Sequence, residues 1–203
     1  MNLNILNEAD LARLRDIVAE AERVLILGHV NADGDAVGSC LTWAEYLRRQ
    51  GQIANIVVPD QFPDFLRWMP GIERIIRYDK VPQTVDKLFA ESDTIFCLDF
   101  NTPSRITDEL GEKLVAAPGR KVLIDHHLGP DVNTVLTISH PDMSSTAELV
   151  FRLIHQLGGY EDMTKNMAVT AYCGMMTDTG GFTFNSTRPG IFLIISLLLA
   201  TGI

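Results

Sequence analysis

The chain has 203 residues, of which 46% are hydrophobic, and its formal charge at pH 7 is −9. The length and the apolar content predict one sizeable folded domain or two small ones, and they exclude an intrinsically disordered chain. The negative charge argues against binding of long duplex nucleic acid, because proteins that bind it usually carry a broad basic face.

Apolar runs and helical spacings alternate along the chain. A first amphipathic helix is expected behind an Asn7 cap. Strands are expected at 23–28, 53–58, 75–78, 94–99 and 121–125, with a further edge strand within 132–138, and helices at 36–50, 81–91, 104–116, 145–157, 163–176 and from Pro189 onward. This order predicts an α/β fold with three αβα layers and a mainly parallel, Rossmann-like sheet.

Three further features concern burial and location. We expect Phe62, Phe65, Trp68 and Met69 to fill the core, with substrate contact as the alternative, and Cys40, Cys97 and Cys173 to be reduced core residues. The N-terminus lacks the pattern of a secretory signal. The longest apolar run, 191–200, is too short for a bilayer, which needs roughly 20 residues, and predicts a buried helix. We therefore expect a soluble, cytoplasmic protein with no membrane partner.

Acidic and imidazole side chains recur where buried segments end. Strand 23–28 leads into the pattern His-x-x-x-Asp-x-Asp, strand 94–99 ends in an aspartate, strand 121–125 leads into Asp-His-His, and a further aspartate follows an apolar stretch that begins near Met167. The residues concerned are His29, Asp33, Asp35, Asp99, Asp125, His126, His127 and Asp178. Open α/β sheets hold ligands beyond the carboxyl ends of their strands, so these groups are expected at one edge.

The mixture of imidazole and carboxylate without thiolate suits Mn²⁺, Mg²⁺, Co²⁺ or Fe²⁺ better than a structural zinc. Six residues are candidate ligands: His29, Asp33, Asp35, Asp99, His126 and Asp178. Six is too many for one open metal ion and suits two. Two cations that share a carboxylate and a water can activate that water and clamp the oxygens of a displacement at phosphorus. The sequence therefore predicts phosphoryl chemistry.

Other residues are candidates for contacts with the substrate. His127 is expected near the phosphate or the leaving oxygen, and the backbone N–H groups of Gly180 and Gly181 near a phosphate. Arg105 and Arg188 are weaker candidates, because surface arginines are more often solvated or ion-paired. Gly34 is expected to permit a tight backbone course between the two acids beside it.

Each motif also has a purely structural interpretation. A strand-end aspartate such as Asp99 commonly caps a loop, and Asp178 in Thr-Asp-Thr-Gly-Gly is typical of a turn. A non-catalytic module that holds one structural cation is therefore the alternative from another class. The coincidence of four motifs in one α/β pattern favours the catalytic interpretation.

These motifs resemble the DHH phosphoesterase family, named after its Asp-His-His sequence. The resemblance covers the segments 29–35, Asp99, 125–127 and 178–181, and Ser144-Ser145-Thr146 with Glu148 is similar to another family segment. It implies two Mn²⁺ ions with a bridging hydroxide. His29, Asp33 and Asp99 would bind one ion, and Asp35, Asp99, His126 and Asp178 the other, with Asp99 bridging. Asp125 would orient His126, and His127 would face the scissile phosphate.

The segment 28–39 is most similar to the branch of the family that degrades short oligoribonucleotides and removes the 3′-phosphate of 3′-phosphoadenosine 5′-phosphate. Exonucleases of the RecJ type usually have Asp in place of His29, and family II pyrophosphatases usually read Asp-Thr-Asp at 33–35. Cyclic dinucleotide phosphodiesterases usually carry additional N-terminal domains. A pyrophosphatase or an exopolyphosphatase is the alternative within the family.

The resemblance also implies a domain organisation. Residues 1–203 correspond to the catalytic DHH domain, and we expect a smaller C-terminal substrate domain that this chain does not contain. The expected partner is a short nucleotide or oligonucleotide phosphoester, and a homodimer is compatible with the sequence.

Overall fold

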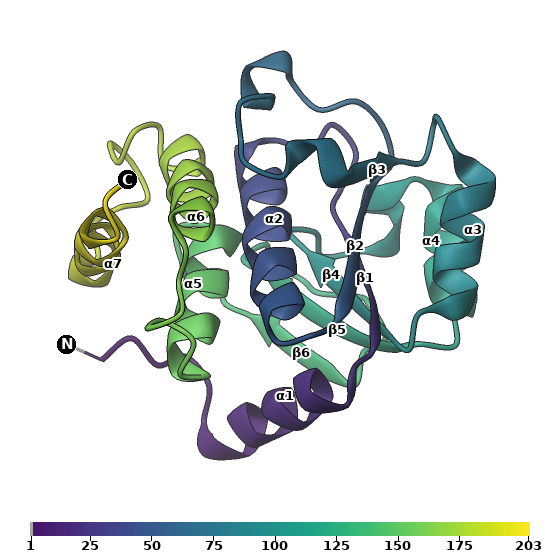
Figure 1. Ribbon diagram of the computed structural model, residues 1–203, viewed down its shortest axis with the longest axis horizontal. Helices are drawn as coiled ribbons and strands as arrows, with labels where there is room; N and C mark the ends of the chain where they lie inside the picture. The colour runs from purple at the N-terminus through teal and green to yellow at the C-terminus, as the bar shows by residue number, and fades with distance from the viewer. Residues whose placement is uncertain (1) are drawn as a thin grey trace.

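Six parallel strands form one sheet in the computed structural model, which describes residues 2–203 (Figure 1). The strands are β1 (Arg23–Leu27), β2 (Ile53–Val58), β3 (Ile75–Arg77), β4 (Thr94–Leu98), β5 (Arg120–Asp125) and β6 (Leu136–Ser139), in the order β3-β2-β1-β4-β5-β6. The chain winds outward from β1 in one direction and from β4 in the other. The crevice between the carboxyl ends of β1 and β4 is therefore the position where such sheets bind ligands.

Helices cover both faces of the sheet. They are α1 (Glu8–Glu20), α2 (Gly34–Arg49), α3 (Pro82–Glu91), α4 (Asp108–Ala116), α5 (Thr146–Gln156), α6 (Lys165–Asp178) and α7 (Pro189–Ala200). Successive strand residues alternate between two cores: Ile26 packs with α1, α2 and α5, and Leu25 packs with α3 and α4. Helix α6 packs on α2 and α5, and α7 lies outermost (Figure 1). The predicted αβα fold is confirmed.

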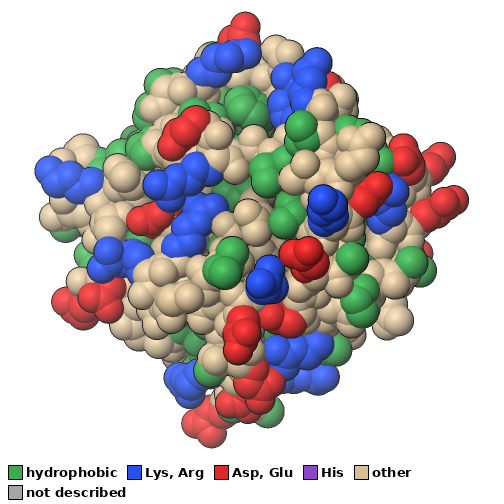
Figure 2. Space-filling view, turned by 45° about the vertical axis from the view of Figure 1, so that its right-hand side comes forward, with side chains coloured by type: hydrophobic (Ala, Val, Ile, Leu, Met, Phe, Trp, Pro, Cys, Tyr) green, Lys and Arg blue, Asp and Glu red, His purple; other side chains and the backbone are tan. Residues whose placement is uncertain are grey.

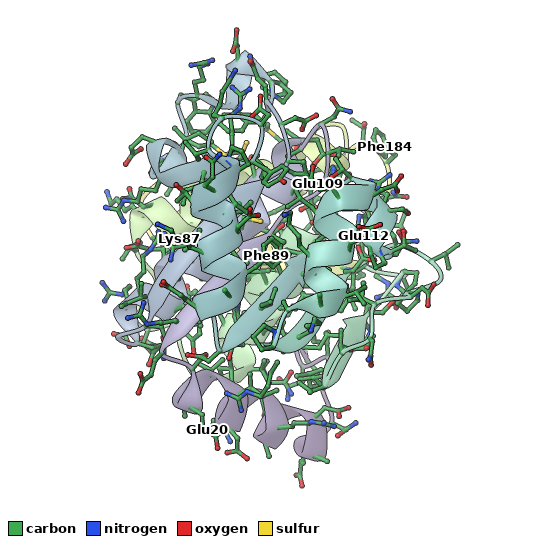
Figure 3. The ribbon with its side chains drawn as sticks, turned by 90° about the vertical axis from the view of Figure 1, so that its right-hand side faces the viewer. Glu20, Lys87, Phe89, Glu109, Glu112 and Phe184 are labelled. Carbon is green, nitrogen blue, oxygen red and sulfur yellow. The ribbon has the colours of Figure 1, made fainter. Side chains whose placement is uncertain are left out.

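Figure 3 looks onto the face that α3 and α4 cover. Phe89 of α3 is buried beneath these helices, whereas Lys87, Glu109 and Glu112 are exposed. On the surface in Figure 2, basic and acidic side chains are interspersed rather than separated into one broad basic face. None of the helices in residues 2–203 combines the length and the apolar character that a bilayer crossing requires.

Some element boundaries differ from those expected. Helix α2 begins at Gly34, so Asp35 lies in its first turn, and α6 extends to Asp178, which is helical rather than part of a turn. The helix expected at 104–116 is interrupted at Thr107, where φ is 76°. A short 3₁₀ turn precedes this break, and the Thr107 hydroxyl caps the α-helix that follows it.

Two predictions of burial are wrong in part. In the loop after β2, Met69 is buried but Phe65 and Trp68 are 63% and 60% exposed. Helix α7 is also only half buried, with Phe192 and Leu199 53% and 50% exposed, because it contacts α5 and α6 on one side only. All three cysteines are buried and free, as expected, and burial raises the pKa of Cys97 to about 12.

Candidate metal centre

The candidate ligands come together at the carboxyl edge of the central strands. His29 follows β1, Asp99 follows β4, and His126 follows β5, while Asp178 arrives from the last turn of α6. Their ligand atoms form three overlapping groups, each within 4.8 Å: His29, Asp33 and Asp99; Asp35, His126 and Asp178; and Asp99, His126 and His127. The structure thus brings together all six residues that were predicted as ligands.

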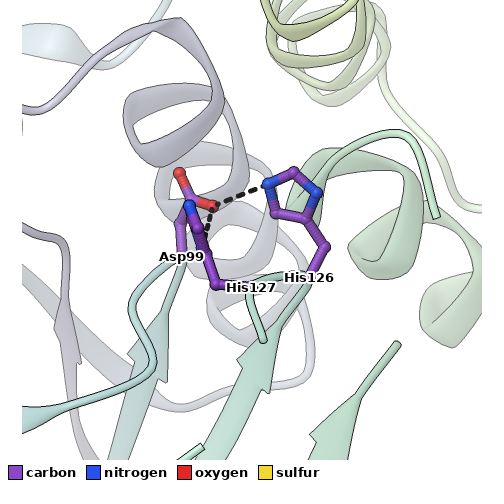
Figure 4. Close-up of side chains that lie close together, drawn as sticks. All are labelled: Asp99, His126 and His127. Atoms are coloured by element: carbon purple, nitrogen blue, oxygen red, sulfur yellow. Dashed lines mark ion pairs between the residues drawn. The ribbon is translucent and has the colours of Figure 1, made fainter. Parts of the chain in front are cut away.

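Asp99 contacts several members of this cluster, and Figure 4 shows its ion pairs with His126 and His127. Its Oδ2 is 3.4 Å from His29 Nε2, and its Oδ1 is 3.6 Å from His126 Nε2. The residue is 1% exposed and has a φ of 64°, which non-glycine residues rarely adopt. Strain of this kind persists where surrounding contacts enforce it, and it is common at functional sites.

Asp35 is held by the N-terminus of α5. Its Oδ2 accepts a hydrogen bond of 2.6 Å from Thr146 N, and its Oδ1 accepts one of 2.7 Å from Ala147 N. The Thr146 hydroxyl donates to Asp99 Oδ1 at 2.8 Å. The first N–H groups of a helix have no partners within the helix and bind anions. One helix end therefore fixes two carboxylates of the cluster.

The tautomer of His29 follows from its neighbours. Its Nδ1 lies 2.7 Å from the Val30 carbonyl oxygen. A carbonyl only accepts hydrogen bonds, so Nδ1 carries a proton, and in the neutral ring Nε2 presents a lone pair towards Asp99. A lone pair and a carboxylate oxygen that face each other require a cation between them or an additional proton. This arrangement is typical of a histidine that binds a metal through Nε2.

The carboxylates of the cluster lie next to histidines and to one another. Within residues 2–203, none of Asp33, Asp35, Asp99 and Asp178 pairs with a lysine or arginine. Burial, and then repulsion by neighbouring aspartates, raises the pKa of Asp35 and of Asp99 well above the ordinary value. Asp178 also lies at the negative end of the α6 dipole. Divalent cations would offset this charge, so the donor set fits a metal ion.

Asp125 differs from its expected role. Its Oδ1 lies 2.7 Å from Nδ1 of His127, whereas Nδ1 of His126 faces the Met143 carbonyl oxygen at 3.5 Å. Asp125 therefore orients His127 and not His126. The hydrogen bond to Asp125 raises the pKa of His127, which favours the protonated imidazolium.

A groove of roughly 520 Å³ opens beside His126 and His127. Its wall includes Leu128, Met143 and Arg188, and the Arg188 guanidinium is paired with Asp142. Arg188 thus lines the groove beside the two histidines, and its contact with a substrate stays a prediction. Arg105 is exposed, and its positive charge acts on His127 by lowering the pKa of that residue.

The three glycines have other roles in the structure than phosphate contact or a special backbone turn. The N–H groups of Gly180 and Gly181 donate to the carbonyls of Thr177 and Met176, and so terminate α6 instead of facing a phosphate. Gly34 does not have a positive φ. A Cβ atom on Gly34 would lie 2.3 Å from Thr177 Oγ1, so this glycine serves the close contact between α2 and α6.

One of the two donors at the start of α5, Thr146, lies in a segment that resembles the family, but the sequence predicted no role for it. Thr146 and Ala147 contact the centre, but neither was predicted as a site residue. A signal was present: Ser145-x-x-Glu148 is the pattern of a capping box, which marks a helix N-terminus with free N–H groups. The Ser145 hydroxyl does accept from Glu148 N at 3.0 Å.

The fold and the site define a class: α/β proteins that gather carboxylates and imidazoles into a metal centre at the switch point of a parallel sheet. Residues 23–175 match the DHH family, N-terminal domain, and the chain belongs to this family. The resemblance that the motifs indicated is thereby confirmed.

The chain is 32% identical over 180 residues to "Bifunctional oligoribonuclease and PAP phosphatase NrnA" of Thermus thermophilus, a match that covers 89% of this chain and 50% of the relative. It is 27% identical to "Cyclic-di-AMP phosphodiesterase PdeA" of Listeria monocytogenes, covering 85% of this chain and 27% of that protein. The chain thus spans half the length of the first relative and about a quarter of the second.

Among solved structures, an exopolyphosphatase-related protein from Bacteroides fragilis is 48% identical with a TM-score of 0.95, and the match covers 98% of this chain and 58% of that one. Exonuclease RecJ bound to manganese matches with a TM-score of 0.58 at 16% identity, covering 98% of this chain and 49% of that one. The second likeness shows the fold alone.

Proposed function

We propose that this chain is the catalytic domain of a phosphoesterase that uses two divalent metal ions, with Mn²⁺ preferred and Mg²⁺ or Co²⁺ as substitutes. The observation that carries the proposal is the presence of two separate sets of donors, one containing Asp99 and the other His126. These two residues also belong to a third set, which links the other two. A single structural cation, as in the non-catalytic alternative, has no need of three overlapping groups on an exposed edge.

The proposed ligands divide between two positions. His29, Asp33 and Asp99 would hold one ion, and Asp35, Asp99, His126 and Asp178 the other. When bound, the two ions would polarise the phosphoryl oxygens and lower the pKa of a water that attacks phosphorus. Asp35 and Asp99 form the buried floor of the centre, and Asp33 is exposed above it. These side chains would hold the ions from the buried side, and the substrate would approach from the exposed side.

His127 is the proposed general acid. Its side chain is 38% exposed, lines the groove and is held at Nδ1 by Asp125, which leaves Nε2 free to face a substrate. From this position Nε2 of His127 would deliver a proton to the leaving oxygen. Arg188 is proposed to bind a substrate phosphate after exchanging its contact with Asp142, and Arg105 to add positive charge near His127.

The proposed substrates are short oligoribonucleotides, the 3′-phosphate of 3′-phosphoadenosine 5′-phosphate, or both. The named activities of the Thermus relative support this choice, as does a groove that suits a nucleotide better than a duplex. The alternative is a pyrophosphatase or exopolyphosphatase, which the description of the Bacteroides neighbour favours.

One experiment separates these substrates. The full-length protein, treated with chelator and reloaded with Mn²⁺, is assayed side by side on adenosine 3′,5′-bisphosphate, a short RNA, cyclic di-AMP, pyrophosphate and polyphosphate. We expect the first two to be hydrolysed fastest and only after Mn²⁺ is restored. Faster hydrolysis of pyrophosphate or polyphosphate would establish the alternative. Hydrolysis of none, with one bound metal per chain, would contradict the enzymatic proposal.

A further inference from the structure

Behind the metal centre lies a buried ion pair. Glu148 and Arg152 stand one turn apart on α5 and are 1% and 5% exposed. Glu148 Oε1 accepts from Arg152 Nε at 2.8 Å and lies 2.6 Å from Nη2. A buried pair of this kind rarely stabilises a fold more than apolar side chains of equal volume would, because desolvation offsets the attraction. Its other contacts indicate what it does.

The second oxygen of Glu148 holds the turn that leads into α5. Its Oε2 accepts from Ser144 N at 3.0 Å and from the Ser144 hydroxyl at 2.6 Å. Two residues after Ser144, Thr146 donates its N–H to Asp35 and its hydroxyl to Asp99. Glu148 therefore fixes, from the side away from the ligands, the short turn whose donors place two of the carboxylates.

Arg152 connects this turn to the rest of the molecule. Its Nη1 donates to the Leu3 carbonyl oxygen at 3.2 Å. Its Nη2 lies 2.6 Å from the position that a Cβ atom on Gly190 would take, so the guanidinium is packed against the start of α7. The N-terminal segment, α5 and α7 thus hold one guanidinium group, and that group holds Glu148.

We infer that Arg152 is a positioning residue of the metal centre. By neutralising Glu148 and fixing its carboxylate, it sets where Thr146 and Ala147 present their donors to Asp35 and Asp99, although it touches neither a ligand atom nor the substrate. The inference rests on the proposed function in so far as Asp35 and Asp99 bind metal.

The test is a titration of the chelated full-length protein with Mn²⁺ in the absence of substrate, followed by electron paramagnetic resonance. We expect Arg152→Met to bind Mn²⁺ at least tenfold more weakly, the size of effect typical for groups that orient metal ligands. Arg152→Lys retains the charge, and we expect its affinity for Mn²⁺ to lie between that of Arg152→Met and that of the wild type. The double variant Glu148→Gln with Arg152→Met is expected to recover most of the affinity, because the amide still accepts from Ser144 N and no buried charge is left alone.

Arg48→Met is the matched control. Arg48 is a half-buried arginine that also binds a backbone carbonyl, that of Ala54. It lies at the other end of α2, about 20 Å along the helix from Asp35 at 1.5 Å per residue. We expect it to lower the unfolding temperature without changing the affinity for Mn²⁺.

Affinity within twofold of wild type in Arg152→Met, or an equal loss in Arg48→Met, would overturn the inference. If Arg152→Met does not fold, the Mn²⁺ affinities of Arg152→Lys and of the double variant test the inference instead. An affinity of Arg152→Lys within twofold of wild type would then overturn it. Wild-type protein that binds two Mn²⁺ ions but hydrolyses none of the substrates would contradict the proposed function, and the metal titration would still decide the role of Arg152. Wild-type protein that binds no Mn²⁺ would contradict both.

Discussion

At the scale of residues, the centre is organised around Asp99. This carboxylate shares contacts with His29 and His126, and it accepts a hydrogen bond from Thr146. Its φ is positive, at 64°, directly after β4. Among the aspartates in residues 2–203, Asp99 is the one that lies within 4 Å of both His29 and His126, so its loss should affect both proposed metal positions.

We expect Asp99→Asn to lower turnover more than Asn at Asp33, Asp35 or Asp178. An amide cannot bridge two cations with two anionic oxygens, so the loss should exceed the roughly 10- to 100-fold that outer contacts of a metal site cost. The measurement is kcat together with the Mn²⁺ content of each variant. Turnover within a few fold of wild type would refute the bridging role.

A second residue-scale prediction concerns His127. The hydrogen bond to Asp125 is the largest cause of the raised pKa of His127. In Asp125→Asn this pKa should fall towards 6.5, the usual value for histidine. An NMR titration of the His127 ring in chelated protein measures the change. Asp131→Asn, an exposed site in the same loop, is the control, and an unchanged midpoint in Asp125→Asn would show that Asp125 does not set the charge of His127.

At the scale of elements, glycines let α2 and α6 approach closely enough for Asp35 and Asp178 to meet. A Cβ atom on Gly38 would lie 2.5 Å from the Thr170 carbonyl oxygen, and one on Gly174 would lie 2.6 Å from the Ala147 Cβ and 3.2 Å from Asp35 Oδ1. Side chains at these positions would separate the helices that carry the two carboxylates.

Gly38→Ala should therefore weaken Mn²⁺ binding as well as lower stability by about 1–3 kcal/mol, the usual cost of overpacking. Gly119→Ala is the matched control, since its Cβ atom would lie 2.6 Å from the Ser92 carbonyl oxygen at the opposite edge of the sheet. Chemical unfolding and a Mn²⁺ titration measure the two effects. Equal loss of affinity in both variants would mean that the α2–α6 contact does not define the centre.

At the scale of the whole molecule, the clustered acids are a cost to folding when no metal is bound. The pKa of Asp35, Asp99 and Asp178 is raised, chiefly by burial. The folded protein thus keeps these carboxyl groups protonated at pH values where the unfolded chain has lost the protons, because the ordinary pKa of an aspartate is 3.8. The contribution of these groups to stability is present below that pH and is lost as pH rises through their folded pKa values.

The stabilisation that Mn²⁺ gives should therefore grow as pH rises from 4 towards 8. The difference between the unfolding temperatures with Mn²⁺ and with chelator isolates this effect from the other carboxylates. Asp35→Asn removes one of the carboxyl groups whose pKa is raised. In this variant the effect of Mn²⁺ on the unfolding temperature should therefore change less with pH. A difference that does not change with pH would contradict the linkage between metal binding and these carboxylates.

The sequence determined the sheet and the identity of the groups that cluster at its edge. Runs such as Val24–Leu27 and Ile95–Leu98 are apolar because both faces of a parallel strand are covered, and the ligands follow directly where these strands end. Local pattern was sufficient here, since the direction of a strand fixes the edge at which its last residues lie.

Only the tertiary structure decided which groups meet. The partner of Asp125, the use of the N-terminus of α5 by Asp35, and the close contact of Gly38 with α6 all join residues whose relative positions depend on packing. Burial also depends on packing. Helix α7 has apolar side chains on every side, yet the helices that it contacts cover only one of its faces. Periodicity shows which side chains can be buried, but the arrangement of the layers determines which ones are.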